Sequence, residues 1–286
     1  FGSVGSGTQI DHIQVSYSND DSFEWFGGSA NCSYLIAYKG WDDDFDTDNG
    51  FDGEVRYCLS VRDPRIADTS QSNGFESDNN ASGAETTPFT SAHFRNITLV
   101  GPKTTKNADF LNSSDYITAG DMFPDNGSKL GRFQSAFQIR RSSKLNISNA
   151  LAIGWPVGLI IDGEKGQTVS YAKAGSFKLE NIVFAGMDAI GTDKNKEYSD
   201  YLFDYLTGTE DRTKPSFSHT FFLSGTGNRI VEESALNLLD PFMTGQNFCP
   251  ATEISDGKGG YIGAFRNASD NWMRGWTNFD PQHTVY

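Results

Sequence analysis

The sequence predicts an all-β protein, folded as a right-handed parallel β-helix with long loops and a small cap region near the C-terminal end. Three observations favour this fold. Short apolar runs bounded by turn residues recur along the chain, a strand motif repeats, and helical periodicity is sparse. The composition agrees, because 30 glycines suit frequent turns, while 22 Phe, 11 Tyr and 5 Trp supply bulk for a core.

The expected strands are short, and turn-forming residues bound each of them. They cover residues 10–17, 34–38, 55–61, 94–100, 136–140, 145–153, 159–161, 177–185 and 220–223. Helices are expected only at 199–206 and 232–239, where apolar residues recur with a period near 3.6. The polar stretches 68–90 and 102–131 are expected to be long loops.

Internal repetition predicts the solenoid. Segments 96–101 (NITLVG), 149–154 (NALAIG) and 181–186 (NIVFAG) share one pattern, and 35–40 (LIAYKG) keeps its strand and Gly. Ile13-Gln-Val matches Leu35-Ile-Ala at an offset of 22 residues, which fits one coil of a β-helix. A corner Asn is expected to bond its copy in the next coil. An antiparallel sandwich is the alternative, but it predicts regular two-residue hairpins, which are few here.

We expect residues 1–286 to form a single β-helix domain, with irregular and capping segments in 187–286. The chain opens at Phe1, without Met, in a Gly/Ser-rich turn, so we expect a mature or processed fragment, or one from which preceding residues are absent. The longest apolar run is shorter than the ~18 residues of a membrane span, which predicts no transmembrane segment. Cys32 and Cys58 either pair between neighbouring coils or stay free and buried, and Cys249 has no expected partner.

The net charge of −14 makes DNA and RNA poor partners, because phosphate binding needs clustered Lys and Arg. Five aspartates crowd the segment 41–50 (WDDDFDTDNG), and like charges at such density repel each other unless a cation lies among them. Ca²⁺ suits flexible loops rich in oxygen ligands. The predicted calcium ligands are Asp42, Asp44, Asp46, Asp48 and Asn49. The alternative is a solvated acidic loop.

A second group of polar residues could carry chemistry. Glu76 and Asp78 alternate, so an extended segment would point both the same way. Carboxylate pairs serve glycoside hydrolases, and Arg or calcium with a base serves polysaccharide lyases. The candidate catalytic residues are Asp43, Asp46, Glu76, Asp78 and Arg140. The four histidines are scattered and predict no catalytic group.

Ligand binding is predicted at two kinds of side chain. Trp25 and Trp41 could stack on sugar rings, with packing in the core as the alternative. Arg140 and Arg141 could bind a sugar carboxylate, with an ion pair to the acidic clusters as the alternative.

Several blocks together carry a family resemblance. They are 10–28 (IDHIQVSYSNDDSFEWFGG), 35–51 (LIAYKGWDDDFDTDNGF), 60–68 (SVRDPRIAD), 72–83 (SNGFESDNNASG), 96–102 (NITLVGP), 154–163 (GWPVGLIIDG) and 275–286 (GWTNFDPQHTVY). The chain resembles uncharacterised secreted or lipid-anchored surface proteins of Bacteroidetes with a pectin-lyase-like right-handed β-helix. The resemblance implies an extracellular or outer-membrane location and association with TonB-dependent transporters. It also implies that N-terminal coils are missing from this sequence, and it supplies no catalytic residues.

From these observations we expect a non-catalytic cell-surface or secreted β-helix that binds glycan, polysaccharide or another extracellular ligand, or assists nutrient uptake at the outer membrane. One alternative is a calcium-assisted polysaccharide lyase or glycoside hydrolase built on the acidic residues. The other is a structural or adhesive subunit that acts through self-association.

Overall fold

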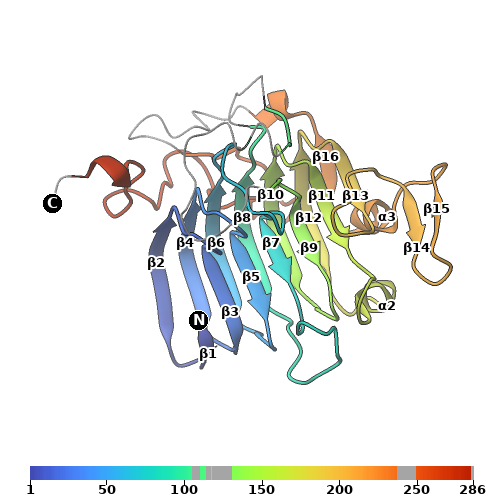
Figure 1. Cartoon of the computed structure of the whole chain (residues 1–286). Coiled ribbons are helices and arrows are strands. Elements are labelled where there is room, and N and C mark those ends of the chain that lie inside the picture. The colour runs from blue at the N-terminus through green and yellow to red at the C-terminus, as the bar shows by residue number, and fades with distance from the viewer. Residues whose placement is uncertain (105–109, 114–116, 118–130, 237–248, 285–286) are drawn as a thin grey trace.

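A computed structural model describes residues 1–104, 110–113, 117, 131–236 and 249–284. The chain alternates between two seven-stranded parallel sheets, and each coil adds one strand to each sheet (Figure 1). Sheet A contains β1 (Gly2–Val4), β3 (Phe23–Gly28), β5 (Phe45–Asp48), β7 (Phe75–Ser77), β9 (Ser135–Ile139), β11 (Val157–Ile161) and β13 (Ala189–Thr192). Sheet B contains β2 (Gln9–Ser16), β4 (Asn31–Tyr38), β6 (Glu54–Val61), β8 (His93–Val100), β10 (Asn146–Ile153), β12 (Leu179–Ala185) and β16 (Arg229–Val231). The predicted parallel β-helix is confirmed.

The interior of the solenoid holds a row of phenylalanines on the inner side of sheet A. Phe23, Phe45, Phe75 and Phe137 occupy equivalent register positions on successive strands. Neighbouring rings in this row lie 5.7, 5.2 and 5.6 Å apart between centroids. Since side chains alternate along a strand, the residues between these rings point to the outer face of sheet A. The functional side chains are placed there.

Every long strand of sheet B bends at one position, where the residue has a positive φ. The bend residues are His12, Tyr34, Tyr57, Asn96, Asn149 and Asn181, with φ between 54° and 58°. The predicted contact between corner asparagines forms once, since Nδ2 of Asn181 donates to Oδ1 of Asn149 over 3.1 Å. In the first coils aromatic stacking takes its place, with Tyr34 and Tyr57 rings 5.0 Å apart.

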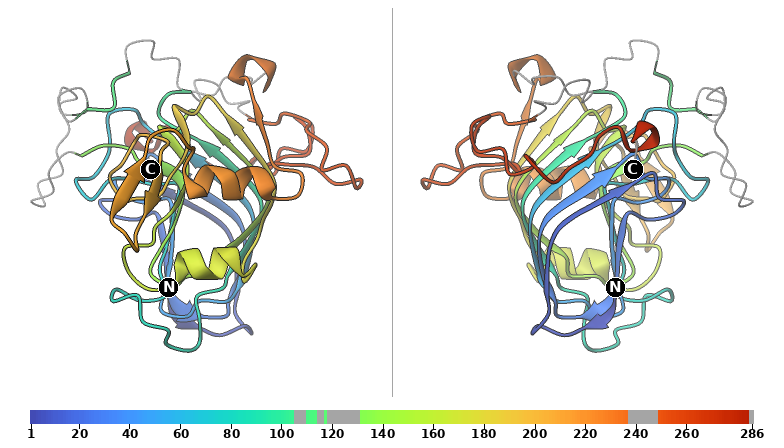
Figure 2. Two further views of the ribbon diagram at one scale, coloured as in Figure 1. Left: turned by 90° about the vertical axis from the view of Figure 1, so that its right-hand side faces the viewer. Right: turned by 90° about the vertical axis from the view of Figure 1, so that its left-hand side faces the viewer.

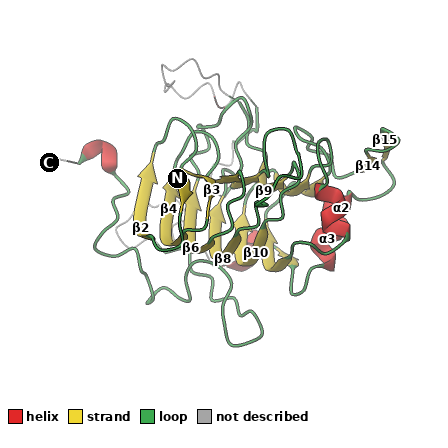
Figure 3. Ribbon diagram, turned by 90° about the horizontal axis from the view of Figure 1, so that it is seen from below, coloured by secondary structure: helices red, strands yellow, loops and turns green. Residues whose placement is uncertain are grey.

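The C-terminal end of the solenoid is covered by two helices, α2 (Thr168–Lys173) and α3 (Phe217–Ser224), which cross it in Figures 2 and 3. The Phe222 ring of α3 stacks on Phe184 of the last full coil with centroids 4.2 Å apart. The strand predicted at 220–223 is therefore wrong. Ser216 caps the helix by accepting the N–H of His219, and burial of Phe222 outweighs local strand propensity.

A hairpin of β14 (Leu202–Asp204) and β15 (Thr209–Asp211) projects beside α3 and replaces the helix predicted at 199–206. Gly208, with a φ of 67°, makes the turn that joins the two strands. Leu206 at this turn is 97% exposed. Its side chain therefore does not belong to the buried apolar face that the predicted helix required. Of the other predicted helix, 232–239, a 3₁₀ turn covers Glu233–Leu236, and the remainder lies outside the described residues.

A C-terminal strap, residues 249–284, runs back along the outer face of sheet B towards the first coils (Figure 1). It includes the 3₁₀ turn Pro281–His283. Phe265 and Met273 of the strap pack on Leu59 and Val61 of β6. Cys249 is buried in the same cluster. The strap therefore covers a second apolar layer on the outside of the solenoid. It belongs to the segment 187–286, in which irregular and capping structure is expected.

Two further expectations concern loops and cysteines. The stretch 68–90, expected to be a loop, contains β7, while most of 102–131 lies outside the described residues. Cys32 and Cys58 are free and buried, so of the two alternatives the thiols stay unpaired.

Candidate functional site on the outer face of sheet A

A row of acidic side chains crosses neighbouring strands on the outer face of sheet A. Phe45 and Thr47 of β5 are buried, and Asp46 between them points the opposite way. Asp46 lies in register with Glu24 of β3 on one side and with Glu76 of β7 on the other. Because neighbouring strands are about 4.8 Å apart, the three carboxylates are close neighbours.

Two groups of three carboxylates form at the N-terminal end of this row. Asp21, Glu24 and Asp46 each place one carboxylate oxygen within 4.8 Å of the other two. Asp21 forms a second group of the same spacing with Asp20 and Asp42. A hard cation such as Ca²⁺ binds oxygen at about 2.4 Å, so oxygens at this spacing can surround one ion.

The electrostatics of these groups also fit a cation. Burial and the charge of Asp42 raise the pKa of Asp21 to about 8. Burial and the charge of Glu76 raise the pKa of Asp46 well above its ordinary value. Oδ1 of Asp46 and Oδ1 of Asp42 are buried without a hydrogen-bond partner. A bound divalent cation would satisfy these oxygens and keep the carboxylates ionised, so the residues fit calcium.

Two arginines balance the far end of the acidic row. Nε of Arg140 donates to Oδ1 of Asp78 over 2.8 Å, and the same guanidinium pairs with Glu76. Arg141 donates to the other oxygen of Asp78 over 2.7 Å. Burial raises the pKa of Glu76 to about 7, although the charge of Arg140 opposes the shift. The ion pair that was one alternative for Arg140 and Arg141 is thus confirmed.

Asp44, a predicted calcium ligand, lies inside the solenoid. It is fully buried, and its Oδ2 lies 3.0 Å from Nε of Arg62 and accepts a hydrogen bond from Ser60. Arg62 is fully buried as well and donates to the backbone carbonyls of Gly40 and Asn73. The metal-ligand prediction for Asp44 is wrong, because the buried arginine needs a counter-ion and Asp44 turns inward to provide it.

The other predicted ligands divide between two places. Asp42 and Asp46 belong to the carboxylate groups described above. Asp48 lies at the far end of β5 and accepts the backbone N–H of Asn49 over 2.6 Å. Asn49 is exposed in the following turn with a φ of 52°. Among the described residues, Asp48 belongs to neither carboxylate group.

The two tryptophans predicted to stack on sugars are core residues, so this prediction is wrong. Trp25 is 0% exposed and stacks on Phe51 at 5.3 Å inside the solenoid. Trp41 is 4% exposed, and its Nε1 donates to Asp68 over 2.9 Å. Both side chains point inward because the large apolar area of an indole ring favours burial. Neither can present a ring face to a glycan.

Sequence reasoning missed Asp20, Asp21 and Glu24 as acidic partners of the 41–50 run. The signal was present in the 22-residue offset, which aligns Asp21 with Asp43 and Glu24 with Asp46. The structure shows the same pairing, since the backbone N–H of Asp43 donates to Oδ1 of Asp21 over 2.9 Å. A repeat period therefore identifies residues that stack in neighbouring coils, even when they lie in separate motifs.

The outer face of sheet A changes character beyond β7. There it carries the apolar residues Val157 and Ile160 of β11 and Ala189 of β13. Tyr198 packs against Val157 and Ile160, which point outward at positions where earlier strands carry polar groups. The hydroxyl of Tyr205 donates to Asp162 over 2.6 Å. The acidic face is therefore confined to the first half of the sheet.

Comparisons with known proteins place the chain in a family. A family model described as a pectate-lyase-like beta helix domain matches residues 1–229. No curated protein and no solved structure matches the chain. Among the described residues, no helix has the length and hydropathy that a membrane crossing requires. The matched segment contains all of sheet A, sheet B as far as β12, and the acidic face, and the chain belongs to the family of pectate-lyase-like β-helix domains.

Proposed function

We propose that the chain is an extracellular, non-catalytic glycan-binding β-helix, which holds its ligand through a calcium ion on the outer face of sheet A. The observation that carries the proposal is the group of Asp21, Glu24 and Asp46, whose carboxylate oxygens lie within 4.8 Å of one another. Asp46 contributes a buried oxygen without a hydrogen-bond partner. Asp42 and Asp20 extend the same negative field.

The charge of the face decides how a glycan would bind. An acidic sugar would be repelled by the carboxylates, and a divalent cation between them would reverse that repulsion. Calcium sites of extracellular modules bind with dissociation constants of about 10⁻⁴ to 10⁻³ M, which a partly hydrated site of three carboxylates can reach. Membership of the pectate-lyase-like family supports a carbohydrate as the ligand.

Calorimetric titration with calcium tests the proposal. Asp46→Asn is expected to weaken calcium binding about tenfold or more, because it removes one of three charged ligands. Asp48→Asn is the matched control, since Asp48 lies on the same strand but outside the carboxylate group. The proposal fails if calcium does not bind, or if Asp46→Asn and Asp48→Asn change the affinity equally. A polysaccharide pull-down with calcium and with chelator then tests the glycan step.

A second candidate function is cation-assisted glycan cleavage, and one observation favours it. Glu76, with a pKa raised to about 7 by burial, lies in register beside Asp46. A carboxyl group that titrates near neutrality can act as general acid or base. The strand spacing of about 4.8 Å is close to the carboxyl separation of retaining glycosidases. Product release from acidic and neutral polysaccharides, lost in Glu76→Gln and in chelator, would establish cleavage in place of binding alone.

A further inference from the structure

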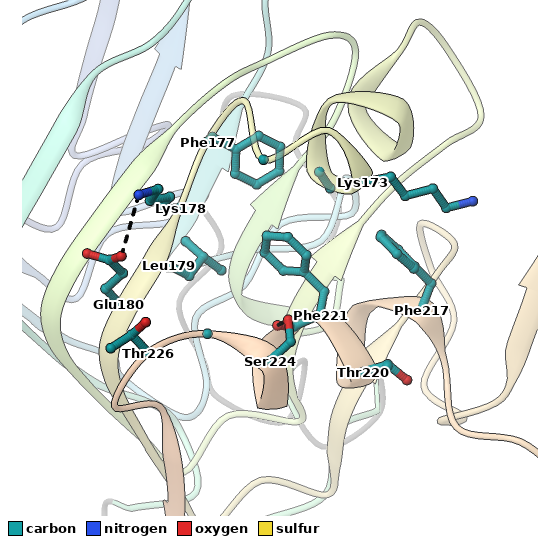
Figure 4. Close-up of a pocket in the computed structure, with 13 residues that line it drawn as sticks. Lys173, Phe177, Lys178, Leu179, Glu180, Phe217, Thr220, Phe221, Ser224 and Thr226 are labelled. Atoms are coloured by element: carbon teal, nitrogen blue, oxygen red, sulfur yellow. Dashed lines mark hydrogen bonds and ion pairs between the residues drawn. The ribbon is translucent and has the colours of Figure 1, made fainter.

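A pocket lies at the C-terminal end of the solenoid, away from the acidic face. It is bounded by α2, by α3 and by the start of β12, and its volume is about 460 Å³ (Figure 4). This volume falls within the range of small-molecule sites, about 300–1,000 Å³. The pocket belongs to sheet B and to the end helices, so it shares no residue with the carboxylate groups of sheet A.

The floor of the pocket is apolar and rich in rings. Phe177 and Leu179 are 2% exposed and form its base. Phe221 of α3 is half-buried, with its ring 5.6 Å from Phe177 and 6.0 Å from Phe217 between centroids. Figure 4 shows the three phenyl rings side by side along the pocket. A ligand that presents the flat face of a ring would replace water over this apolar surface.

The rim of the pocket is positively charged. Figure 4 shows the ammonium groups of Lys178 and Lys173 on opposite sides of the three rings. Lys178 lies 3.9 Å from Glu180, and both side chains are largely exposed, at 68% and 42%, so this pair is weak. The lining thus carries two ammonium groups and one carboxylate, in a chain whose net charge is −14. The local charge favours an anionic ligand.

Hydroxyl groups complete the rim. Thr220, Ser224 and Thr226 line the pocket and are exposed. The hydroxyls of Thr220 and Ser224 donate to backbone carbonyls of α3 and its N-cap, so their oxygens can accept hydrogen bonds from hydroxyl groups of a bound molecule. An apolar floor with a few polar groups around it is the usual composition of a small-ligand site. Orientation would come from the hydroxyl and ammonium groups, and most of the binding free energy from the buried ring area.

We propose that this pocket binds a small six-membered ring compound that carries one carboxylate. The ring lies on Phe221 and Phe217, which are only partly buried, and the carboxylate accepts hydrogen bonds from Lys173 or Lys178. Aromatic acids and uronic acid monosaccharides share this chemistry. Binding here needs no divalent cation, so it is independent of the calcium site proposed for sheet A.

A titration in the presence of chelator tests the pocket, with binding monitored by NMR chemical shift changes or by calorimetry. The probes are phenylacetate and glucuronate, with phenylacetamide and glucose as uncharged counterparts. Saturable binding of either acid, with its uncharged counterpart at least about tenfold weaker, is the expected result. Binding of phenylacetate would identify the ligand class as aromatic acids, and binding of glucuronate would identify it as uronic acid monosaccharides. The proposal is overturned if neither acid binds, or if the uncharged compounds bind equally well.

Variants localise the binding. Phe221→Ala is expected to weaken the bound acid about tenfold, Phe221→Leu less, and Lys173→Gln with Lys178→Gln to remove the preference for the acid. Leu223→Ala is the matched control, because Leu223 is on the same helix, is 54% exposed and does not line the pocket. Unchanged affinity in Phe221→Ala, with a melting temperature like that of Leu223→Ala, also overturns the proposal.

Discussion

The two halves of the outer face of sheet A share one backbone register and differ in chemistry. On β3, β5 and β7 the outward positions carry Glu24, Asp46 and Glu76, whereas β9 and β11 carry Gln138 and Ile160 at the same register. On the second half, Tyr198 packs against the apolar side chains of Val157 and Ile160, whereas the first half gathers carboxylates. The comparison teaches that a solenoid repeats the position of a side chain but not its chemical environment. That environment depends on the residue types in each coil and on the segments that pack against them.

The largest expected effect comes from the ion pair beneath the acidic half. Arg62→Ala leaves Asp44 buried without a counter-charge and should lower the free energy of unfolding by about 3–5 kcal/mol. Urea denaturation measures it. Arg56→Ala is the control, because Arg56 on β6 is exposed and pairs with Glu54 at the surface, where about 0–1 kcal/mol is expected. Equal losses in both variants would contradict the structural role of Arg62.

Replacing both buried partners sharpens this test. Arg62→Met with Asp44→Leu removes the two charges together and should recover much of the stability lost in Arg62→Ala. The recovery would show that the cost lies in the unpaired carboxylate rather than in the volume of the arginine side chain.

The next largest effect is the pH dependence of stability, which we expect to come from the acidic half of the outer face of sheet A. Burial raises the pKa of Asp21 to about 8 and that of Glu76 to about 7, above the value of about 4 in the unfolded chain. The folded chain therefore binds more protons than the unfolded chain between about pH 4 and pH 8, and stability falls as pH rises. Melting temperatures in chelator should show this fall, and Asp21→Asn should reduce it.

Calcium should reverse that trend above neutral pH. Binding at a hundredfold excess over the dissociation constant stabilises the folded state by about 2.7 kcal/mol, and it requires ionised carboxylates. A melting temperature insensitive to calcium at pH 8 would count against the cation site, whatever its pH dependence in chelator.

A smaller effect is expected from extending the acidic row onto β9, in the second half of the outer face of sheet A. Gln138 is 1% exposed and lies beside Glu76, so Gln138→Glu buries a carboxyl group next to another. We expect a loss of about 1–3 kcal/mol at pH 7 from the desolvated charge. Since burial favours the protonated form, the loss should shrink near pH 4. Denaturation at both pH values measures it, and a pH-independent loss would point to packing instead.

The smallest effect concerns the bend in the long strands of the opposite sheet, sheet B. Asn181→Ala removes the amide that donates to Asn149 and places alanine at a φ of 55°. We expect a loss of about 1–2 kcal/mol, from one hydrogen bond and the strain of a left-handed residue. Asn181→Gly keeps the backbone free and should lose less than the alanine variant. A larger loss with glycine would exclude backbone strain as the cause.

Local sequence was sufficient to locate strands and the acidic run, but it was insufficient to orient single side chains. Glu76 of β7 and Asp78, just after this strand, both pair with one side chain, as their alternate spacing predicts. That side chain is Arg140, which directly follows β9. Trp25 points inward because its indole packs in the core, and Asp44 points inward because it pairs with the buried Arg62. Neither contact is visible in the neighbouring residues of the sequence. The end helix at 217–224 likewise formed because Phe222 covers Phe184.

By itself, the sequence determined the solenoid, its coil length of about 22 residues and the concentration of carboxylates in the early coils, because repeat period and composition are properties of the linear chain. Only the tertiary structure decided which carboxylates meet. Asp21, Glu24 and Asp46 come together through the parallel register of β3 and β5. Contacts between coils depend on register and burial, and these are set by the whole core rather than by any one segment.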